Sequence, residues 1–239
     1  MLKTILFDLD GTLLPMEEPR FLEGYFGLLT RAMAQDGFDG KELVSVLWQG
    51  VAAMVANDGT RTNEIVFRDV FARAYPDRDA DAALARLETF YRTDFNRAAA
   101  CCGFNPAAGE TVRKLKRRGF SLILASNPVF PRFAQEARLR WAGVDPADFS
   151  LFTSYENFSF SKPNPDYYRA ILSECGLAPD ECLMVGNDAA EDATAAGEAG
   201  IPVFLLTDCL INRKGKDVTK WRRGSFPELM RVIDEATGN

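Results

Sequence analysis

Residues 6–15, LFDLDGTLLP, decide the fold, because they end a short apolar run on two aspartates, Asp8 and Asp10, before a glycine and a threonine. The run from residue 2 to residue 7 has the length and apolar character of a buried strand. Side chains alternate across a strand, so Asp8 and Asp10 are expected to share one side while Leu9 points to the other. Two like charges there mark either a solvated acidic turn or a cation held between them.

The composition is that of a globular chain without a basic surface. The 239 residues suffice for one large or two modest domains, and the 47% hydrophobic fraction suffices for a sizeable core. The net charge of −6 disfavours broad nucleic-acid binding, and no apolar run approaches the roughly 18 residues of a membrane span. Asp8 comes too early for a signal peptide. Five cysteines without metal-type spacing suggest a reducing cytoplasm. We therefore expect a cytoplasmic protein with no nucleic-acid or membrane partner, and the sequence carries no signal for an oligomeric state.

Histidine is absent from the sequence. This absence excludes Ser-His and Cys-His nucleophilic pairs, histidine zinc sites and histidine as a general base. Acid–base chemistry near neutral pH must therefore come from carboxylates, lysine, tyrosine or a metal-bound water.

The hydrophobic period divides the chain into two kinds of structure. Residues 21–95 carry four amphipathic helical patterns, separated by the breakers DGFDG, NDGT and YPDRD. After residue 106, strands alternate with helices. The expected strands are 120–126, 150–154, 182–186 and 201–206. The expected helices are 109–119, 130–141, 164–176 (N-cap Asn164, then Pro165), 188–200 and one from Ser225, where Glu228 completes a capping box. This alternation predicts an α/β fold with a doubly wound parallel sheet.

The helical block interrupts the α/β pattern just after its first strand. We therefore predict a catalytic core domain at 1–14 and 106–239, with a helical cap domain at 15–105. An insert at the carboxyl end of a strand lies over the crevice where open parallel sheets bind ligands. We expect hinges near 15–20 and 103–106 and substrate choice within the insert. The aromatic side chains of the insert, including Phe26 and Trp48, are interpreted as bundle core. Arg20 is interpreted as solvated, with a substrate anion as the alternative.

Three other strand ends carry polar groups that match the two aspartates. LASNP supplies the Ser126 hydroxyl and the Asn127 backbone N–H, and FSKPNP supplies Lys162. VGNDAAEDA supplies Asp188 and Asp192, four residues apart at the start of a predicted helix. Carboxylates with a hard cation, most simply Mg²⁺, together with a hydroxyl and a lysine, are the parts that phosphoryl transfer requires.

The ordered set DLDGT, SN, KP and GND followed by Asp192 resembles the four motifs of the haloacid dehalogenase superfamily, over the whole chain and with a type-1 helical cap. The resemblance implies a Mg²⁺-dependent phosphatase acting on a small phosphorylated metabolite. It implies that Asp8 is the nucleophile and a metal ligand. Asp10 would be the general acid and base, and its carbonyl would also bind the metal. Ser126, the Asn127 backbone and Lys162 would bind the phosphoryl group.

The last motif departs from the family pattern. Asn187 stands where many members have aspartate, so the metal is assigned to Asp188 by its spacing from Asp192, with Asn187 as the alternative. Asp192 would position metal-bound waters, and Thr12 would tighten the turn.

Other activities remain as alternatives. Dehalogenases of this superfamily lack an aspartate at the position of Asp10, and phosphonate cleavage needs a cap lysine, of which residues 19–97 contain only Lys41. A phosphomutase keeps all the motifs. A phosphorylated receiver, or a binding module with a relic site, is the non-enzymatic alternative, and the insert after the first strand disfavours a receiver.

Overall fold

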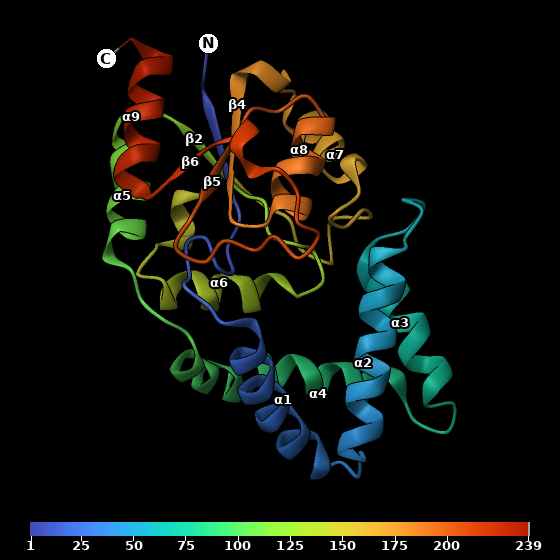
Figure 1. Ribbon diagram of the computed structural model, residues 1–239. Coiled ribbons are helices and arrows are strands. Elements are labelled where there is room, and N and C mark those ends of the chain that lie inside the picture. The colour runs from blue at the N-terminus through green and yellow to red at the C-terminus, as the bar shows by residue number, and fades with distance from the viewer. Residues whose placement is uncertain (239) are drawn as a thin grey trace.

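The computed structural model describes residues 1–238, and a six-stranded sheet forms its centre (Figure 1). The strands are β1 (Thr4–Phe7), β2 (Ser121–Leu124), β3 (Leu151–Phe152), β4 (Cys182–Gly186), β5 (Val203–Leu206) and β6 (Arg222–Gly224). They are arranged in the order β3-β2-β1-β4-β5-β6, and every neighbouring pair is parallel. The predicted parallel α/β sheet is therefore confirmed.

Nine α-helices surround and extend this sheet within residues 1–238. They are α1 (Glu18–Ala34), α2 (Gly40–Val55), α3 (Asn63–Ala74), α4 (Ala80–Arg92), α5 (Pro106–Arg117), α6 (Arg132–Trp141), α7 (Pro165–Cys175), α8 (Ala195–Glu198) and α9 (Phe226–Thr237). The predicted caps of α7 and α9 are confirmed: Asn164 accepts the Asp166 N–H at 2.9 Å, and Glu228 accepts the Ser225 N–H at 2.9 Å. None of the described helices has the length and apolar character to cross a membrane.

Helices cover both faces of the sheet, as a doubly wound fold requires. The side chains of Ile5 and Phe7 pack in a core with α5 and α9, whereas Leu6 packs in a second core with α7 and α8. Figure 1 shows these two helix pairs on opposite sides of the strands. Because β1 is buried on both faces and lies at the centre, the residues that follow it are held at a fixed position.

Three elements differ from the sequence prediction. Strand β6 was not predicted, because its residues Arg222 and Arg223 are exposed and give no apolar pattern. An edge strand pairs with one neighbouring strand only and can form without apolar side chains. Helix α4 ends at Arg92, and a 3₁₀ helix over Asp94–Cys101 follows it. The predicted helix 188–200 begins as a π-helical turn, Ala189–Thr194, and only Ala195–Glu198 is α-helical.

The inserted helices α1–α4 form a further core, shared with Ala134 and Ala137 of α6, beside the carboxyl edge of the sheet (Figure 1). The two connecting segments lie side by side, since Met16 and Cys102 form an antiparallel bridge and Gly103 donates to the Pro15 carbonyl at 2.7 Å. The predicted division at 14/15 and 105/106 stays a prediction.

The insert is also bound to the other half of the chain at the start of α3. The fully buried Asn63 side chain donates to the Pro128 carbonyl at 3.0 Å and to the Ser161 hydroxyl at 2.9 Å, and its backbone N–H donates to Phe158 at 2.9 Å. The insert is therefore attached to the rest of the chain both at its connecting segments and at the start of α3, far from them along the chain.

Candidate active site

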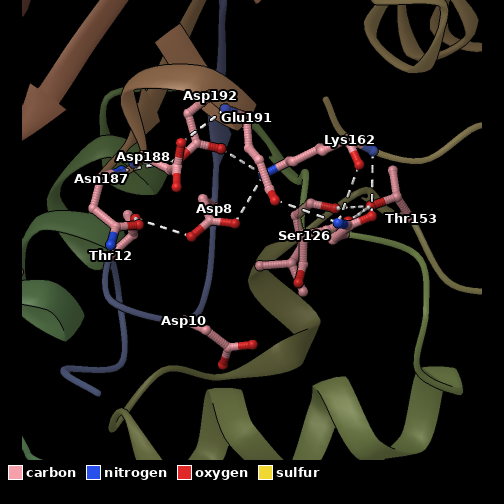
Figure 2. Close-up of polar contacts among 12 residues, drawn as sticks. Asp8, Asp10, Thr12, Ser126, Thr153, Lys162, Asn187, Asp188, Glu191 and Asp192 are labelled. Carbon is pink, nitrogen blue, oxygen red and sulfur yellow. Dashed lines mark hydrogen bonds and ion pairs between the residues drawn. The ribbon is translucent and has the colours of Figure 1, made fainter. Parts of the chain in front are cut away.

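Asp8 lies one residue beyond β1 and is 8% exposed. Its backbone N–H donates to the Val185 carbonyl at 2.9 Å, which continues the pairing of β1 with β4. Its carboxylate accepts two hydrogen bonds, from Lys162 Nζ to Oδ1 at 2.8 Å and from the Thr12 hydroxyl to Oδ2 at 3.0 Å (Figure 2). The side chain is therefore fixed at both oxygens.

Lys162 is buried between two carboxylates, Asp8 at 2.8 Å and Asp192 at 2.6 Å. Burial alone would lower the pKa of Lys162, but Asp192 and Asp8 outweigh it and hold this pKa well above its ordinary value. Burial raises the pKa of Asp8 to about 7; the carboxylates of Asp192 and Asp10 add to the rise, and Lys162 opposes it. The ammonium group of Lys162 thus neutralises only part of the negative charge of the carboxylates around it.

The turn after Asp8 is built around Gly11 and Asn187. Gly11 has φ +84°, and a Cβ there would lie 2.2 Å from Asn187 Nδ2, so only glycine fits. The Thr12 hydroxyl lies 3.0 Å from both Asp8 Oδ2 and Asn187 Oδ1, while Asn187 Nδ2 donates to the Cys209 carbonyl at 2.8 Å. Thr12 therefore links Asp8 to the loop after β4, a contact that the motif spacing did not reveal.

Asp188 and Asp192 have different surroundings, although they are four residues apart. Asp188 is an N-cap whose Oδ1 accepts the N–H groups of Ala190 and Glu191, and no described residue hydrogen-bonds its Oδ2. Asp192 is 1% exposed; its Oδ2 accepts the N–H groups of Asn187 and Asp188, both at 2.9 Å. The Asp192 carboxylate thus bonds back onto the turn that carries Asp188, and this bonding accompanies the π-helical start of the predicted helix.

Ser126 and Asn127 follow β2 and line a cavity that Asp8 and Asp188 also line. The Ser126 carbonyl accepts the hydroxyls of Thr153 at 2.7 Å and Tyr167 at 2.9 Å, which fixes this loop from behind. Within the described residues, neither the Ser126 hydroxyl nor the Asn127 backbone N–H has a hydrogen-bond partner. Both donors therefore remain for a ligand.

The Asp10 carboxylate is directed away from Asp8, toward α6 (Figure 2). It forms an ion pair with Arg138, a residue of α6 that is fully buried and whose guanidinium lies 4.3 Å from the centre of the Phe130 ring. Asp10 Oδ1 and Arg138 Nη2 have no partner among the described residues. Arg138 was not predicted as a site residue, because arginines in the last turn of a helix, as in EARLRW, are ordinarily solvated.

A cavity of about 370 Å³ extends from these groups into the insert. Its floor includes Asp8, Asp10, Ser126 and Asp188, and its far wall is formed by α1, α2 and α4. The interpretation of Trp48 as bundle core is wrong: its side chain is 45% exposed and lines the cavity, in edge contact with the half-buried Phe26 at 5.8 Å. The period of α2 places Trp48 on its apolar face, but α1 and α4 leave that part of the face uncovered.

The carboxylates on the cavity floor fit a Mg²⁺ ion that retains several water ligands. No three acidic or cysteine side chains within residues 1–238 are gathered as a ready-made metal centre. Mg²⁺ in phosphoryl-transfer sites needs only one or two carboxylates, with waters and substrate oxygens completing its shell. Asp8 and Asp188 both line the cavity, and the charged Asp188 has an Oδ2 that is unpaired among the described residues. The neutral Asn187 amide, in contrast, is held by the Cys209 carbonyl and shares the Thr12 hydroxyl with Asp8.

Comparison with known proteins identifies the family. A model of haloacid dehalogenase-like hydrolases matches residues 2–200. The chain belongs to this family. The predicted family is thereby confirmed, as is the prediction of an enzyme of the phosphatase type within this family of hydrolases.

Curated relatives of this haloacid dehalogenase-like hydrolase match most of its length. A phosphoglycolate phosphatase of Rhodospirillum rubrum is 27% identical over 87% of this chain and 80% of the relative. A phosphoserine phosphatase of Thermus thermophilus is 28% identical over 84% and 86%. A glyceraldehyde 3-phosphate phosphatase of Methanocaldococcus jannaschii is 26% identical over 98% and 97%.

Solved structures share the fold of this hydrolase. A 2-haloacid dehalogenase from Pseudomonas syringae superposes with a TM-score of 0.66 at 20% identity, covering 98% of this chain and 99% of that one. A predicted phosphoglycolate phosphatase from Haemophilus somnus gives 0.58 at 20% identity, over 97% and 98%. Both support the α/β architecture with its helical insert.

Proposed function

We propose that the protein is a Mg²⁺-dependent phosphatase that hydrolyses a small phosphorylated metabolite through an aspartyl-phosphate on Asp8. One observation carries the proposal: a buried carboxylate, fixed by Lys162 and Thr12, lies at the floor of a cavity beside two unused hydrogen-bond donors. The names of the curated relatives describe phosphatases of small metabolites: phosphoglycolate, phosphoserine and glyceraldehyde 3-phosphate. A location in the cytoplasm stays a prediction from the cysteine pattern.

The groups around Asp8 can supply the nucleophile, the hydrogen-bond donors and the positive charge that phosphoryl transfer requires. The Asp8 carboxylate is the nucleophile, and the Ser126 hydroxyl with the Asn127 N–H holds phosphoryl oxygens. Lys162 balances the charge of Asp8 as the anionic phosphoryl group approaches. A Mg²⁺ ion held by Asp8, Asp188 and the Asp10 carbonyl would supply the remaining positive charge. Asp192 holds Lys162 and the Asp188 backbone in place.

Asp10 is proposed as the acid and then the base. It protonates the leaving oxygen when Asp8 is phosphorylated and takes a proton from water when the aspartyl-phosphate is hydrolysed. Its carboxylate is paired with Arg138 in the structure. To act on the leaving oxygen, the side chain has to turn away from α6 and into the cavity.

The inserted helices are proposed to act as the cap, with the domain division at residues 1–14 and 106–239 against 15–105. The two attachments support this role. The paired connecting segments can serve as hinges, and the hydrogen bonds of Asn63 close the opposite end.

Phosphate release from p-nitrophenyl phosphate tests the function. We expect turnover with Mg²⁺, loss of turnover in excess chelator, recovery on adding Mg²⁺ back, and little recovery with Ca²⁺, whose looser and larger coordination shell misplaces the attacking carboxylate. With an alkyl phosphate, inorganic phosphate should appear as fast as substrate disappears, as it would not in a phosphomutase. Full turnover in chelator would contradict the metal requirement.

A further inference from the structure

We propose that the leaving group of the natural substrate is uncharged and largely apolar, carries an aromatic or alicyclic ring, and is seated against the insert. This inference deepens the proposed function and rests on it. The surface that receives the ring, here called the apolar wall, is formed by Leu22, Phe26, Leu47, Trp48, Val51 and Leu84.

The apolar wall is continuous with the proposed catalytic groups. It lines the same cavity as Asp8 and Ser126, so a phosphate monoester with its phosphoryl group at Asp8 places its alcohol against α1, α2 and α4. Trp48 is 45% exposed and Val55, beside it on the same cavity, 37% exposed. Large apolar side chains left uncovered within a concave site are typical of a surface that a ligand covers.

Within residues 1–238, no unpaired cation lines the cavity: Arg138, the partner of Asp10, is fully buried and is not a lining residue. Among the described lining residues Arg213 is the one basic side chain; it is 69% exposed and forms an ion pair with Glu18. Lys162 is already engaged by two carboxylates. Arg20, the alternative anion partner from the sequence, donates to the Ala100 carbonyl and does not line the cavity. A carboxylate on the leaving group would therefore lose water without gaining a partner.

Besides Glu18 and Glu88, which form ion pairs with Arg213 and Arg92, the insert contributes two neutral hydroxyl groups to the cavity lining. The Tyr25 and Tyr91 hydroxyls lie 2.5 Å apart and hydrogen-bond each other. Burial raises the pKa of Tyr25 to about 12 and moves that of Tyr91 the same way, so both stay protonated at neutral pH. They can hydrogen-bond to a hydroxyl or ether of the substrate, but they cannot balance a charge.

A matched series of alkyl phosphates tests the inference on the metal-loaded protein: ethyl phosphate, 2-phenylethyl phosphate and 2-(4-carboxyphenyl)ethyl phosphate. Phosphoglycolate is added as the charged counterpart of ethyl phosphate. The first three release similar primary alcohols, so their kcat/KM values differ through binding rather than through leaving-group chemistry. We expect the ring to raise kcat/KM on the order of 30-fold or more. The added carboxylate should lower it on the order of 100-fold, because it is buried unpaired.

A pair of variants locates the effect on the apolar wall. Trp48→Arg places a cation at the wall and should reverse the preference between the phenylethyl and carboxyphenylethyl esters. Ile65→Arg is the matched control, since Ile65 is 42% exposed on α3 and does not line the cavity. Both substitutions replace an exposed side chain, so both variants should fold, and the control should keep the wild-type preference.

The outcomes separate the inference from the proposed function. Equal kcat/KM values across the series, or faster hydrolysis of phosphoglycolate or the carboxyphenylethyl ester, would overturn the inference while leaving a phosphatase. Turnover of p-nitrophenyl phosphate without turnover of any ester in the series would also overturn the inference alone. No phosphate from any monoester in folded, Mg²⁺-loaded protein would overturn the proposed function and the inference with it.

Discussion

Asp8→Asn is expected to lower phosphate release from p-nitrophenyl phosphate by at least about 1,000-fold, because an amide cannot form the aspartyl-phosphate. The substitution keeps the shape of the side chain and an oxygen for the hydrogen bond from Lys162. Asp180→Asn is the matched control: Asp180 is an exposed aspartate in the turn before β4, at the opposite edge of the sheet. It should keep wild-type turnover.

Thermal or denaturant unfolding of the same variant checks that its loss of turnover does not come from a loss of fold. In the folded state the pKa of Asp8 is raised from 3.8 to about 7, so the folded protein binds more protons than the unfolded chain and its stability falls as pH rises through this range. Asp8→Asn has no such group to ionise. In chelator, the free energy of unfolding of the variant relative to wild type should therefore grow by about 3 kcal/mol between about pH 5 and about pH 8. A constant difference would contradict the cause given for the raised pKa.

Asp10→Asn is expected to lower turnover of an alkyl phosphate on the order of 100- to 10,000-fold, since it removes a general acid and a general base at once. The loss should differ between the two steps. p-Nitrophenol leaves readily without a proton, so the variant should still be phosphorylated by its ester and then hydrolyse slowly.

Rapid-mixing measurement of p-nitrophenol release checks this division. Asp10→Asn should give a burst of about one equivalent per protein followed by a slow steady rate. Alkyl phosphate turnover within tenfold of wild type would show that Asp10 does not act as the acid. A variant with no burst and a slow first step would restrict Asp10 to a structural role beside Arg138.

The placement of the motifs was predictable because strand ends are strong local signals. Asp8, Ser126 and Asp188 closely follow the apolar strands β1, β2 and β4, and parallel strands bring their carboxyl ends to one edge of the sheet. Lys162 is the exception: it lies in the loop between β3 and α7, and its 2.8 Å contact with Asp8 depends on how that loop folds back. The edge strand β6 lacked any such signal, since its arginines are exposed.

Side-chain direction beyond a strand end was less predictable. Alternation places Asp8 and Asp10 on one side only while the strand continues, but β1 ends at Phe7 and the turn at Gly11 changes direction. The partner of Asp10, Arg138, is set by how α6 packs, and helical periodicity does not encode that packing. Trp48 was misinterpreted for the same reason, because an apolar helix face does not reveal whether a neighbour covers it.

Covalent trapping during turnover tests the nucleophile directly. Protein quenched in acid while hydrolysing p-nitrophenyl phosphate with Mg²⁺ is reduced with borohydride, which converts an aspartyl-phosphate to homoserine, and its peptides are analysed by mass spectrometry. We expect conversion of Asp8 in the wild type, and none in Asp8→Asn or without substrate. Phosphate release with Asp8 unmodified in every quenched sample, or conversion of another aspartate instead, would contradict the account.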